Sequence, residues 1–120
     1  MIPWSEDWWE ATRDRRLVLQ HCTACRRYQP YPRAICIGCG GDALEFRDAA
    51  GVGTVDSFTT VLRAEEPYTV ARVRLAEGPI LLTHLAAIAA PVCDQPVRIA
   101  WRPLPSVRHL PVFRSADDGL

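Results

Sequence analysis

The spacing of hydrophobic and polar residues changes along the chain, and each kind of spacing predicts a different element. Over residues 4–16, aromatic and charged side chains recur at helical spacing, with acidic residues near the start and arginines near the end, as the helix dipole favours. From residue 51 onwards, short segments rich in β-branched residues alternate between apolar and polar positions. The pattern therefore predicts an N-terminal helix followed by a mainly β protein.

The β part contains one long segment and several shorter ones. The long segment, residues 51–63, carries Gly51 and Gly53 near its start, and such glycines indicate a bend or a bulge. A long, bent first strand followed by shorter strands within about 60 residues is typical of a small closed barrel, and an OB-fold is the leading interpretation. Periodicity alone does not separate an OB-fold from another small barrel. The further strands are expected over residues 69–75, 80–85 and 97–102.

Four cysteines between the helix and the barrel form two Cys-x-x-Cys pairs, Cys22/Cys25 and Cys36/Cys39. Each pair can fold into a tight turn whose two thiolates point at one ion. Four thiolates describe a closed, tetrahedral structural Zn²⁺ site with no open position for a catalytic water. Iron in a rubredoxin-like site is the main competitor, because the same thiolates bind either metal.

Two disulfides are the other interpretation of the four cysteines, and the expected compartment argues against them. The chain begins without a basic, then apolar, leader, and no apolar run approaches the ~20 residues of a membrane span. We therefore expect a reducing cytoplasm and no membrane, which favours a metal. The fifth cysteine, Cys93, is expected to be a partly buried small residue.

Length and composition predict three segments. The chain has 120 residues, 48% of them hydrophobic, which is enough for one domain or for a small metal module fused to a small barrel. The first forty or so residues could not bury much surface alone, so a metal is expected to stabilise them. The expected segments are the helix and zinc ribbon over residues 1–48, the barrel over 49–104 and an irregular, proline-containing tail over 105–120.

The ionisable residues do not form a recognisable catalytic set. His21, His84 and His109 have no nucleophile or paired carboxylates at a familiar spacing. The 14 basic residues, all of them arginine, balance 14 acidic ones, so net charge gives little attraction for nucleic acid. We expect a chain that is not catalytic alone.

Aromatic residues in the first third of the chain are candidates for a partner interface. Trp8 and Trp9 lie in the expected helix, and three tryptophans are more than one helix face easily buries. The helix either packs them against the rest of the chain or uses them to dock a partner protein, since tryptophan is a favoured interface anchor. The candidate interface residues are Trp4, Trp8, Trp9, Tyr28 and Tyr31.

The order of these motifs resembles the DUF35 family over nearly the whole chain, from about Trp8 to Trp101. The resemblance rests on the Cys-Thr-Ala-Cys and Cys-Ile-Gly-Cys turns, on the segment that begins Gly51-Val-Gly-Thr-Val-Asp-Ser-Phe, on Tyr68-Thr-Val-Ala-Arg-Val-Arg-Leu and on Pro96-Val-Arg-Ile-Ala-Trp. It implies a rubredoxin-like zinc ribbon, with all four ligand positions filled here, followed by an OB-fold.

The resemblance also implies a role beside an enzyme. Members of the family are partners of thiolase-superfamily enzymes that act on coenzyme A thioesters: thiolases, acyltransferases and lyases that cleave β-hydroxyacyl-CoA by retro-aldol chemistry, including those that shorten sterol side chains. The partner carries the catalytic residues, and the small subunit helps to form the acyl-CoA site. A heterotetramer of two plus two subunits is implied, and in some proteins the domain is fused to a hydratase-like domain.

Four arginines are candidates for contact with the phosphates of such a shared CoA thioester, because a guanidinium can bind phosphate through two parallel hydrogen bonds. They are Arg33, Arg63, Arg72 and Arg74. The alternative is that these side chains form a solvated barrel face.

Two other functions are compatible with the same motifs. Zinc ribbons and OB-folds also bind single-stranded nucleic acid, which requires a basic groove with stacking aromatics; Phe58, Tyr68 and Trp101 are the aromatics that the barrel offers. A rubredoxin-like electron carrier would require iron, but it would not require a barrel or a helix rich in tryptophan.

Overall fold

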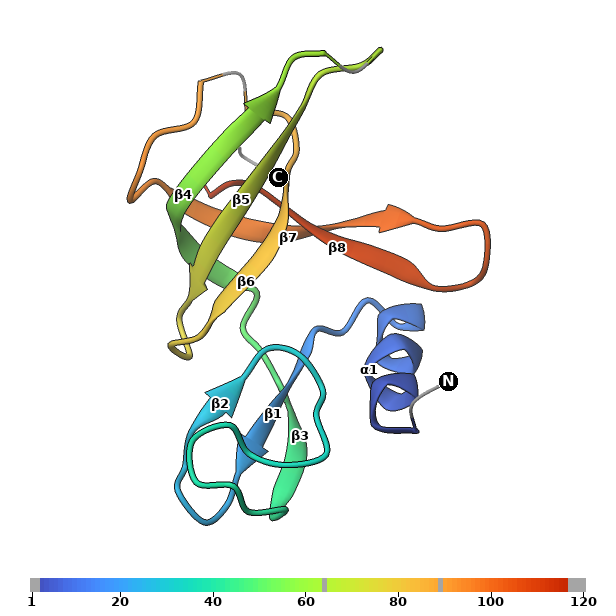
Figure 1. Ribbon diagram of the computed structural model, residues 1–120. Coiled ribbons are helices and arrows are strands. Elements are labelled where there is room, and N and C mark those ends of the chain that lie inside the picture. The colour runs from blue at the N-terminus through green and yellow to red at the C-terminus, as the bar shows by residue number, and fades with distance from the viewer. Residues whose placement is uncertain (1–2, 64, 89, 117–120) are drawn as a thin grey trace.

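The structure, a computed structural model, describes residues 3–63, 65–88 and 90–116, with the side chains of residues 3–5 left out. The described chain forms one helix, a three-stranded sheet and a closed five-stranded barrel. Figure 1 shows the small sheet below the barrel and the helix beside it, beneath the hairpin formed by the last two strands. The prediction of a mainly β protein with an N-terminal helix is confirmed.

Helix α1 spans Pro3–Arg13 and is shorter than the expected 4–16. It stops because the next turn is left-handed: Arg15 has φ 55°, the Arg16 N–H bonds the Ala11 carbonyl and the Arg15 N–H bonds the Thr12 carbonyl. These two bonds form a Schellman motif with arginine where glycine is usual. Among the described residues, no helix is long and apolar enough to cross a membrane.

The three-stranded sheet has strand β1, Val18–Cys22, at its centre. Strands β2, Tyr28–Gln29, and β3, Leu44–Asp48, both pair with β1 in antiparallel register. All five residues of β1 are buried, which explains its apolar and uncharged sequence. Cys22 is the last residue of β1, Cys25 lies in the turn between β1 and β2, and Cys36 and Cys39 lie in the loop between β2 and β3.

The barrel follows directly. Its strands are β4 Val52–Val61, β5 Tyr68–Leu75, β6 Ile80–Leu85, β7 Pro96–Pro103 and β8 His109–Ser115. They close in the order β4-β5-β6-β8-β7, and β7 returns to pair with β4. Every pairing is antiparallel except that of β6 with β8, which is parallel and limited to Leu85 and Phe113. This five-stranded closure is the topology of an OB-fold.

The prediction that residues 105–120 form an irregular tail is wrong, because β8 occupies 109–115 and completes the barrel. All seven residues of β8 pair with β7, and Phe113 in the middle is 0% exposed. The prolines concealed this strand from sequence analysis. Pro111 removes only one N–H donor, and the remaining residues keep the pairing. Residues 117–120 lie outside the described part.

One hydrophobic core joins the helix, the small sheet and the barrel. Trp8 of α1 and Leu19 of β1 belong to the same buried cluster as Val55, Val73 and Phe113 of the barrel. Polar contacts reinforce this packing: Arg108 pairs with Glu6 and Glu10, while the His109 N–H donates to the Thr12 hydroxyl. The metal module is therefore held in a fixed place against the barrel.

Candidate metal centre and flanking grooves

The two cysteine pairs converge on one point beside the three-stranded sheet. The four sulfur atoms of Cys22, Cys25, Cys36 and Cys39 all lie within 4.8 Å of one another. The Cys22 and Cys39 sulfurs are 3.7 Å apart, and those of Cys25 and Cys36 are 3.5 Å apart. Zn–S bonds of about 2.3 Å in a tetrahedron would place the sulfurs about 3.8 Å apart. The sulfur cluster thus fits a tetrahedral zinc ion.

The two turns that carry the cysteines have the same backbone construction. In the first, the Arg26 N–H bonds the Cys22 carbonyl at 2.7 Å and Arg26 has φ 64°. In the second, the Gly40 N–H bonds the Cys36 carbonyl at 2.8 Å and Gly40 has φ 75°. Each turn therefore requires a left-handed residue directly after its second cysteine, and only the second turn uses glycine there.

Backbone amides favour thiolate formation in this cluster. Hydrogen bonds from the N–H groups of Cys39 and Gly38 lower the pKa of Cys36 to about 6. The Arg27 N–H acts in the same direction on Cys25, but the Cys36 thiol and burial outweigh it and raise the pKa of Cys25 to about 11. Four adjacent thiolates repel one another, and a divalent cation removes that conflict.

Two buried glutamines hold the loop between the turns. The Gln20 side chain accepts the Arg33 N–H at 2.8 Å and donates to the Arg33 carbonyl at 3.0 Å. The Gln29 side chain donates to Gln20 at 2.7 Å and accepts the Ile37 N–H at 3.0 Å. The two glutamines thus hydrogen-bond to backbone groups of Arg33 and Ile37, which belong to no strand. These bonds fix the position of the second cysteine turn. Sequence analysis missed it because the partners of a glutamine are not encoded in spacing.

His21 and Cys93, the other two residues considered as possible metal ligands or thiols, do not belong to the cluster. His21 packs its ring on Tyr28, with centroids 4.6 Å apart, and its Nδ1 lies 3.6 Å from Glu45 rather than near the sulfurs. Cys93 is exposed, so the expectation that it is partly buried is wrong. It lies in the connection between β6 and β7, away from the four cysteines of the cluster.

The predicted interface aromatics have different surroundings. Trp8 is 8% exposed and belongs to the core, so for this residue the packing alternative holds. Trp9 meets it edge to face at 4.8 Å and is only partly buried. Tyr31 is 42% exposed, and its hydroxyl accepts the Leu82 N–H of β6 at 2.8 Å. The side chain of Trp4 lies outside the described part.

An apolar groove opens where β6 and β8 separate. It has a volume of about 370 Å³ and lies between α1, the loop at Tyr31 and the two strands. Trp9, Leu82 and Leu110 are among its lining residues, and Leu82 is 60% exposed. The groove exists because β6 pairs with β8 only at its last residue, so the strands diverge before it. Sequence analysis did not predict this groove.

The four predicted arginines do not form one cluster. Arg33 and Arg74 line a second groove, between the small sheet and the barrel. Arg72 lies on the same barrel face as Arg74, and both are 3.8 Å from Asp56. Arg63 is at the opposite end of the barrel, in the loop between β4 and β5. Tyr28 also lines the second groove.

The fold and the four cysteines define a rubredoxin-like zinc ribbon joined to an OB-fold barrel. Two family models match the chain in this order: the rubredoxin-like zinc ribbon domain of ChsH2 over residues 9–45 and the ChsH2 C-terminal OB-fold domain over residues 46–102. The solved structure of the Ltp2-ChsH2(DUF35) aldolase contains a chain that is 36% identical, with a TM-score of 0.85 and coverage of 97% of both chains. The chain belongs to the DUF35 family.

Two further relatives extend the comparison. The crystal structure of a DUF35-family protein of unknown function from Sulfolobus solfataricus shares the fold, with a TM-score of 0.72, 16% identity and coverage of 94% of this chain and 85% of that one. A probable enoyl-CoA hydratase alpha subunit from Thermomonospora curvata is 38% identical over 116 residues, 91% of this chain. This chain spans only 36% of the length of that curated relative.

Proposed function

We propose that this chain is a non-catalytic zinc-ribbon and OB-fold subunit that forms a complex with a thiolase-like enzyme and helps to form its acyl-CoA site. The observation that carries the proposal is the likeness over 97% of its length to a chain of the Ltp2-ChsH2(DUF35) aldolase. That relative is an aldolase, which favours a partner that cleaves a carbon–carbon bond over one that condenses or transfers acyl groups. The family resemblance makes a steroid side chain a candidate substrate.

The histidines support the non-catalytic role. His21 is buried beside Tyr28, His84 stacks on Tyr68 at 5.3 Å, and the His109 Nδ1 lies 2.9 Å from the Thr12 carbonyl. These three side chains lie on different elements, and of the three only His84 lines the apolar groove. A general acid–base pair requires groups that reach the same reacting atom.

The apolar groove supports the proposal that the chain binds a protein partner. The apolar groove beside Trp9 and Tyr31 is flanked by exposed Leu82, and a groove with large aromatic and aliphatic lining is the kind of surface that protein partners or acyl chains cover. In this proposal Trp9, Tyr28 and Tyr31 contact the partner, in a heterotetramer of two plus two subunits. The likeness to the hydratase alpha subunit supports a hydratase-like domain in the same assembly.

Co-expression with the thiolase-like protein of the same host tests the proposal. We expect the two chains to elute together from a sizing column and the partner to cleave β-hydroxyacyl-CoA thioesters only in the complex. The Trp9→Ala variant is expected to lower the recovery of the complex, whereas the Val107→Ala variant, which changes an exposed residue outside the apolar groove, is expected to leave it unchanged. A partner that is equally active alone and never binds this chain would contradict the proposal.

A further inference from the structure

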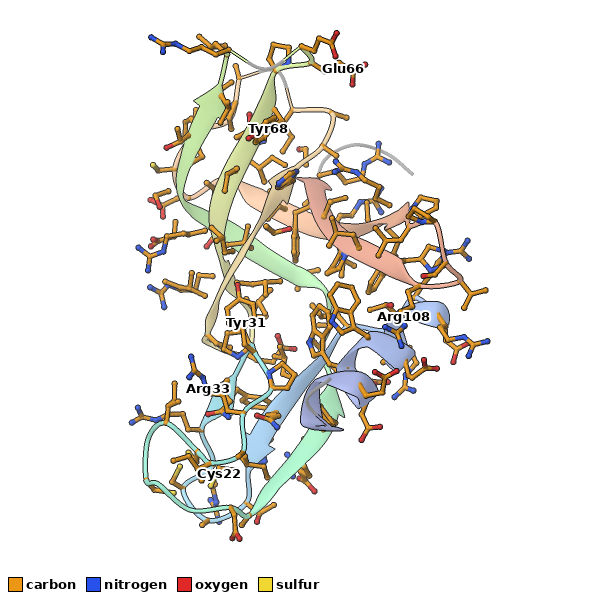
Figure 2. The ribbon with its side chains drawn as sticks, turned by 45° about the vertical axis from the view of Figure 1, so that its right-hand side comes forward. Cys22, Tyr31, Arg33, Glu66, Tyr68 and Arg108 are labelled. Atoms are coloured by element: carbon orange, nitrogen blue, oxygen red, sulfur yellow. The ribbon has the colours of Figure 1, made fainter. Side chains whose placement is uncertain are left out.

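The groove between the zinc ribbon and the barrel is basic. It has a volume of about 610 Å³ and is lined by arginines from three separate segments. Arg26 and Arg27 come from the first cysteine turn, Arg33 from the loop between the turns, and Arg74 from β5. Figure 2 shows Arg33 beside Tyr31 at the junction of the two modules.

The positive charge of this groove is only partly balanced. Within the described part of the chain, Arg26, Arg27 and Arg33 form no ion pair. Glu77 is the one acidic residue among those described that line the groove, and its Oε2 already accepts the Ala50 N–H at 2.8 Å. The guanidinium of Arg74 is 3.8 Å from Asp56, a carboxylate that Arg72 shares. Neighbouring like charges in a concave surface favour an anion.

The backbone positions of these arginines are fixed by the ribbon. The Arg33 N–H and carbonyl are both held by the Gln20 side chain. Arg27 lies across Gly38, where an added Cβ would be 2.9 Å from both the Cδ and the Nε of Arg27. Arg26 occupies the left-handed position of its turn. A site whose backbone is already placed requires less ordering when a ligand binds.

We propose that this groove binds the phosphate groups of a phosphorylated ligand. The planar guanidinium fork matches the oxygen atoms of a phosphate, and several forks converge here from different elements. Arg63 has no part in this site, because it lies at the far end of the barrel. Arg26 and Arg27 take its place as phosphate contacts.

The adjoining surface indicates the rest of the ligand. Tyr31 lines both the basic groove and the apolar groove, so the two are neighbours on one face. A ligand that carries phosphates at one end and an apolar group at the other would cover both. If the proposed function holds, on which this identity rests, the phosphates are those of a coenzyme A thioester and the apolar groove faces its acyl part.

Calorimetric titration of the zinc-loaded chain tests the groove. We expect inorganic pyrophosphate and coenzyme A to bind, with affinities that fall as salt rises, and pantetheine, which lacks the phosphates, to bind at least tenfold more weakly than coenzyme A. The Arg33→Gln and Arg26→Gln variants are each expected to weaken binding about tenfold or more, as loss of a charge-assisted hydrogen bond does. Both side chains are exposed, so zinc content and melting temperature serve as checks that the variants fold.

The matched control is Arg63→Gln, which removes the same charge from an exposed position outside the groove. This variant is expected to keep the affinity for coenzyme A within about twofold, because solvent and salt screen a single exposed charge that lies outside the groove. An equal loss in all three variants would mean attraction by net charge only and would overturn the site. Absence of binding by both pyrophosphate and coenzyme A, to the free chain and to its complex, would overturn it as well.

Native mass spectrometry of the same variants with the partner separates the two proposals. If Arg33→Gln keeps the complex and loses coenzyme A, both proposals stand. If it loses the complex but keeps the affinity for pyrophosphate, the groove is a protein contact, and the phosphate site is wrong while the subunit role holds. If the unmodified chain binds pyrophosphate through these arginines but never binds a partner, the subunit role fails and the phosphate site stands.

Discussion

At the residue scale, the four clustered cysteines are the residues that do most to stabilise the zinc ribbon. Cys22 and Cys36 are buried, whereas Cys25 and Cys39 are exposed, so each pair presents one sulfur to the protein and one to solvent. Amide hydrogen bonds reach the Cys22 and Cys36 sulfurs at 3.5 Å and 3.3 Å. The buried sulfurs are thus the ones that the fold prepares for a cation.

The Cys36→Ser variant is expected to lose zinc and to unfold the ribbon, because metal binding and folding of such a module are coupled. Elemental analysis should give about one zinc ion per chain for the unmodified protein and well under half of that for the variant. The complex with the partner is expected to disappear with the ribbon. Cys93→Ser, an exposed cysteine outside the cluster, is the control and should keep its zinc. A Cys36→Ser variant with full zinc content and an intact complex would refute this role.

Trp8→Ala is expected to destabilise the chain itself. Trp8 is only 8% exposed and belongs to the common core. Its truncation should lower the free energy of unfolding by about 3–5 kcal/mol, which urea denaturation can measure. Trp9→Ala, at a partly buried position, should cost less. If Trp8→Ala left unfolding unchanged and only weakened partner binding, Trp8 would be an interface anchor after all.

Sequence analysis could predict the cysteine cluster because metal ligands are encoded by short spacing. It predicted the strand segments because alternation is local. It could not separate the roles of Trp8 and Trp9, since both lie on one helix and only tertiary packing decides which of them is buried. It also placed Arg63 with Arg33 and Arg74, because charge alone does not show which end of a barrel a residue occupies.

At the element scale, β4 is the strand that must bend to close the barrel. It pairs with β5 along most of its length and with β7 only at Val52–Thr54, and its register shifts between Val55 and Ser57. Sequence analysis placed a bend or bulge near the glycines at the start of this segment, and the shift lies two residues beyond Gly53. Gly53 has a different role, which is to allow the close approach of β5.

Gly53→Ala is expected to destabilise the barrel. A Cβ at this position would lie 2.3 Å from the Arg74 carbonyl oxygen and 3.1 Å from its carbonyl carbon, so the backbones of β4 and β5 would have to separate. We expect a loss of about 2–3 kcal/mol in the free energy of unfolding. Thr54→Ala in the same strand should change it by only about 0.5 kcal/mol. An unchanged melting temperature for Gly53→Ala would show that the strands separate at little cost.

Strand β8, which the sequence predicted as an irregular tail, has a large structural consequence. Without β8, strands β6 and β7 would have no common neighbour and the barrel would stay open. Its start also holds α1, through the Arg108 guanidinium and the His109 contacts with Thr12. Such long-range pairing leaves little trace in local sequence, especially when prolines lie in and near the strand.

At the scale of the whole molecule, two grooves meet at Tyr31 on the face shown in Figure 2. The common core fixes the ribbon against the barrel, so the basic groove and the apolar groove keep their places relative to each other. We assign the basic groove to phosphates and the apolar groove to the apolar part of the ligand or to the partner. In both assignments the chain acts within an enzyme complex.

Native mass spectrometry of the chain purified from its own host tests that claim most directly. We expect one zinc ion per chain and a co-purified thiolase-like subunit, in a heterotetramer of two plus two chains. Metal analysis of the same sample identifies the ion, and iron instead of zinc would revive an electron carrier. A zinc-loaded monomer with no partner and no coenzyme A ligand would contradict the subunit role.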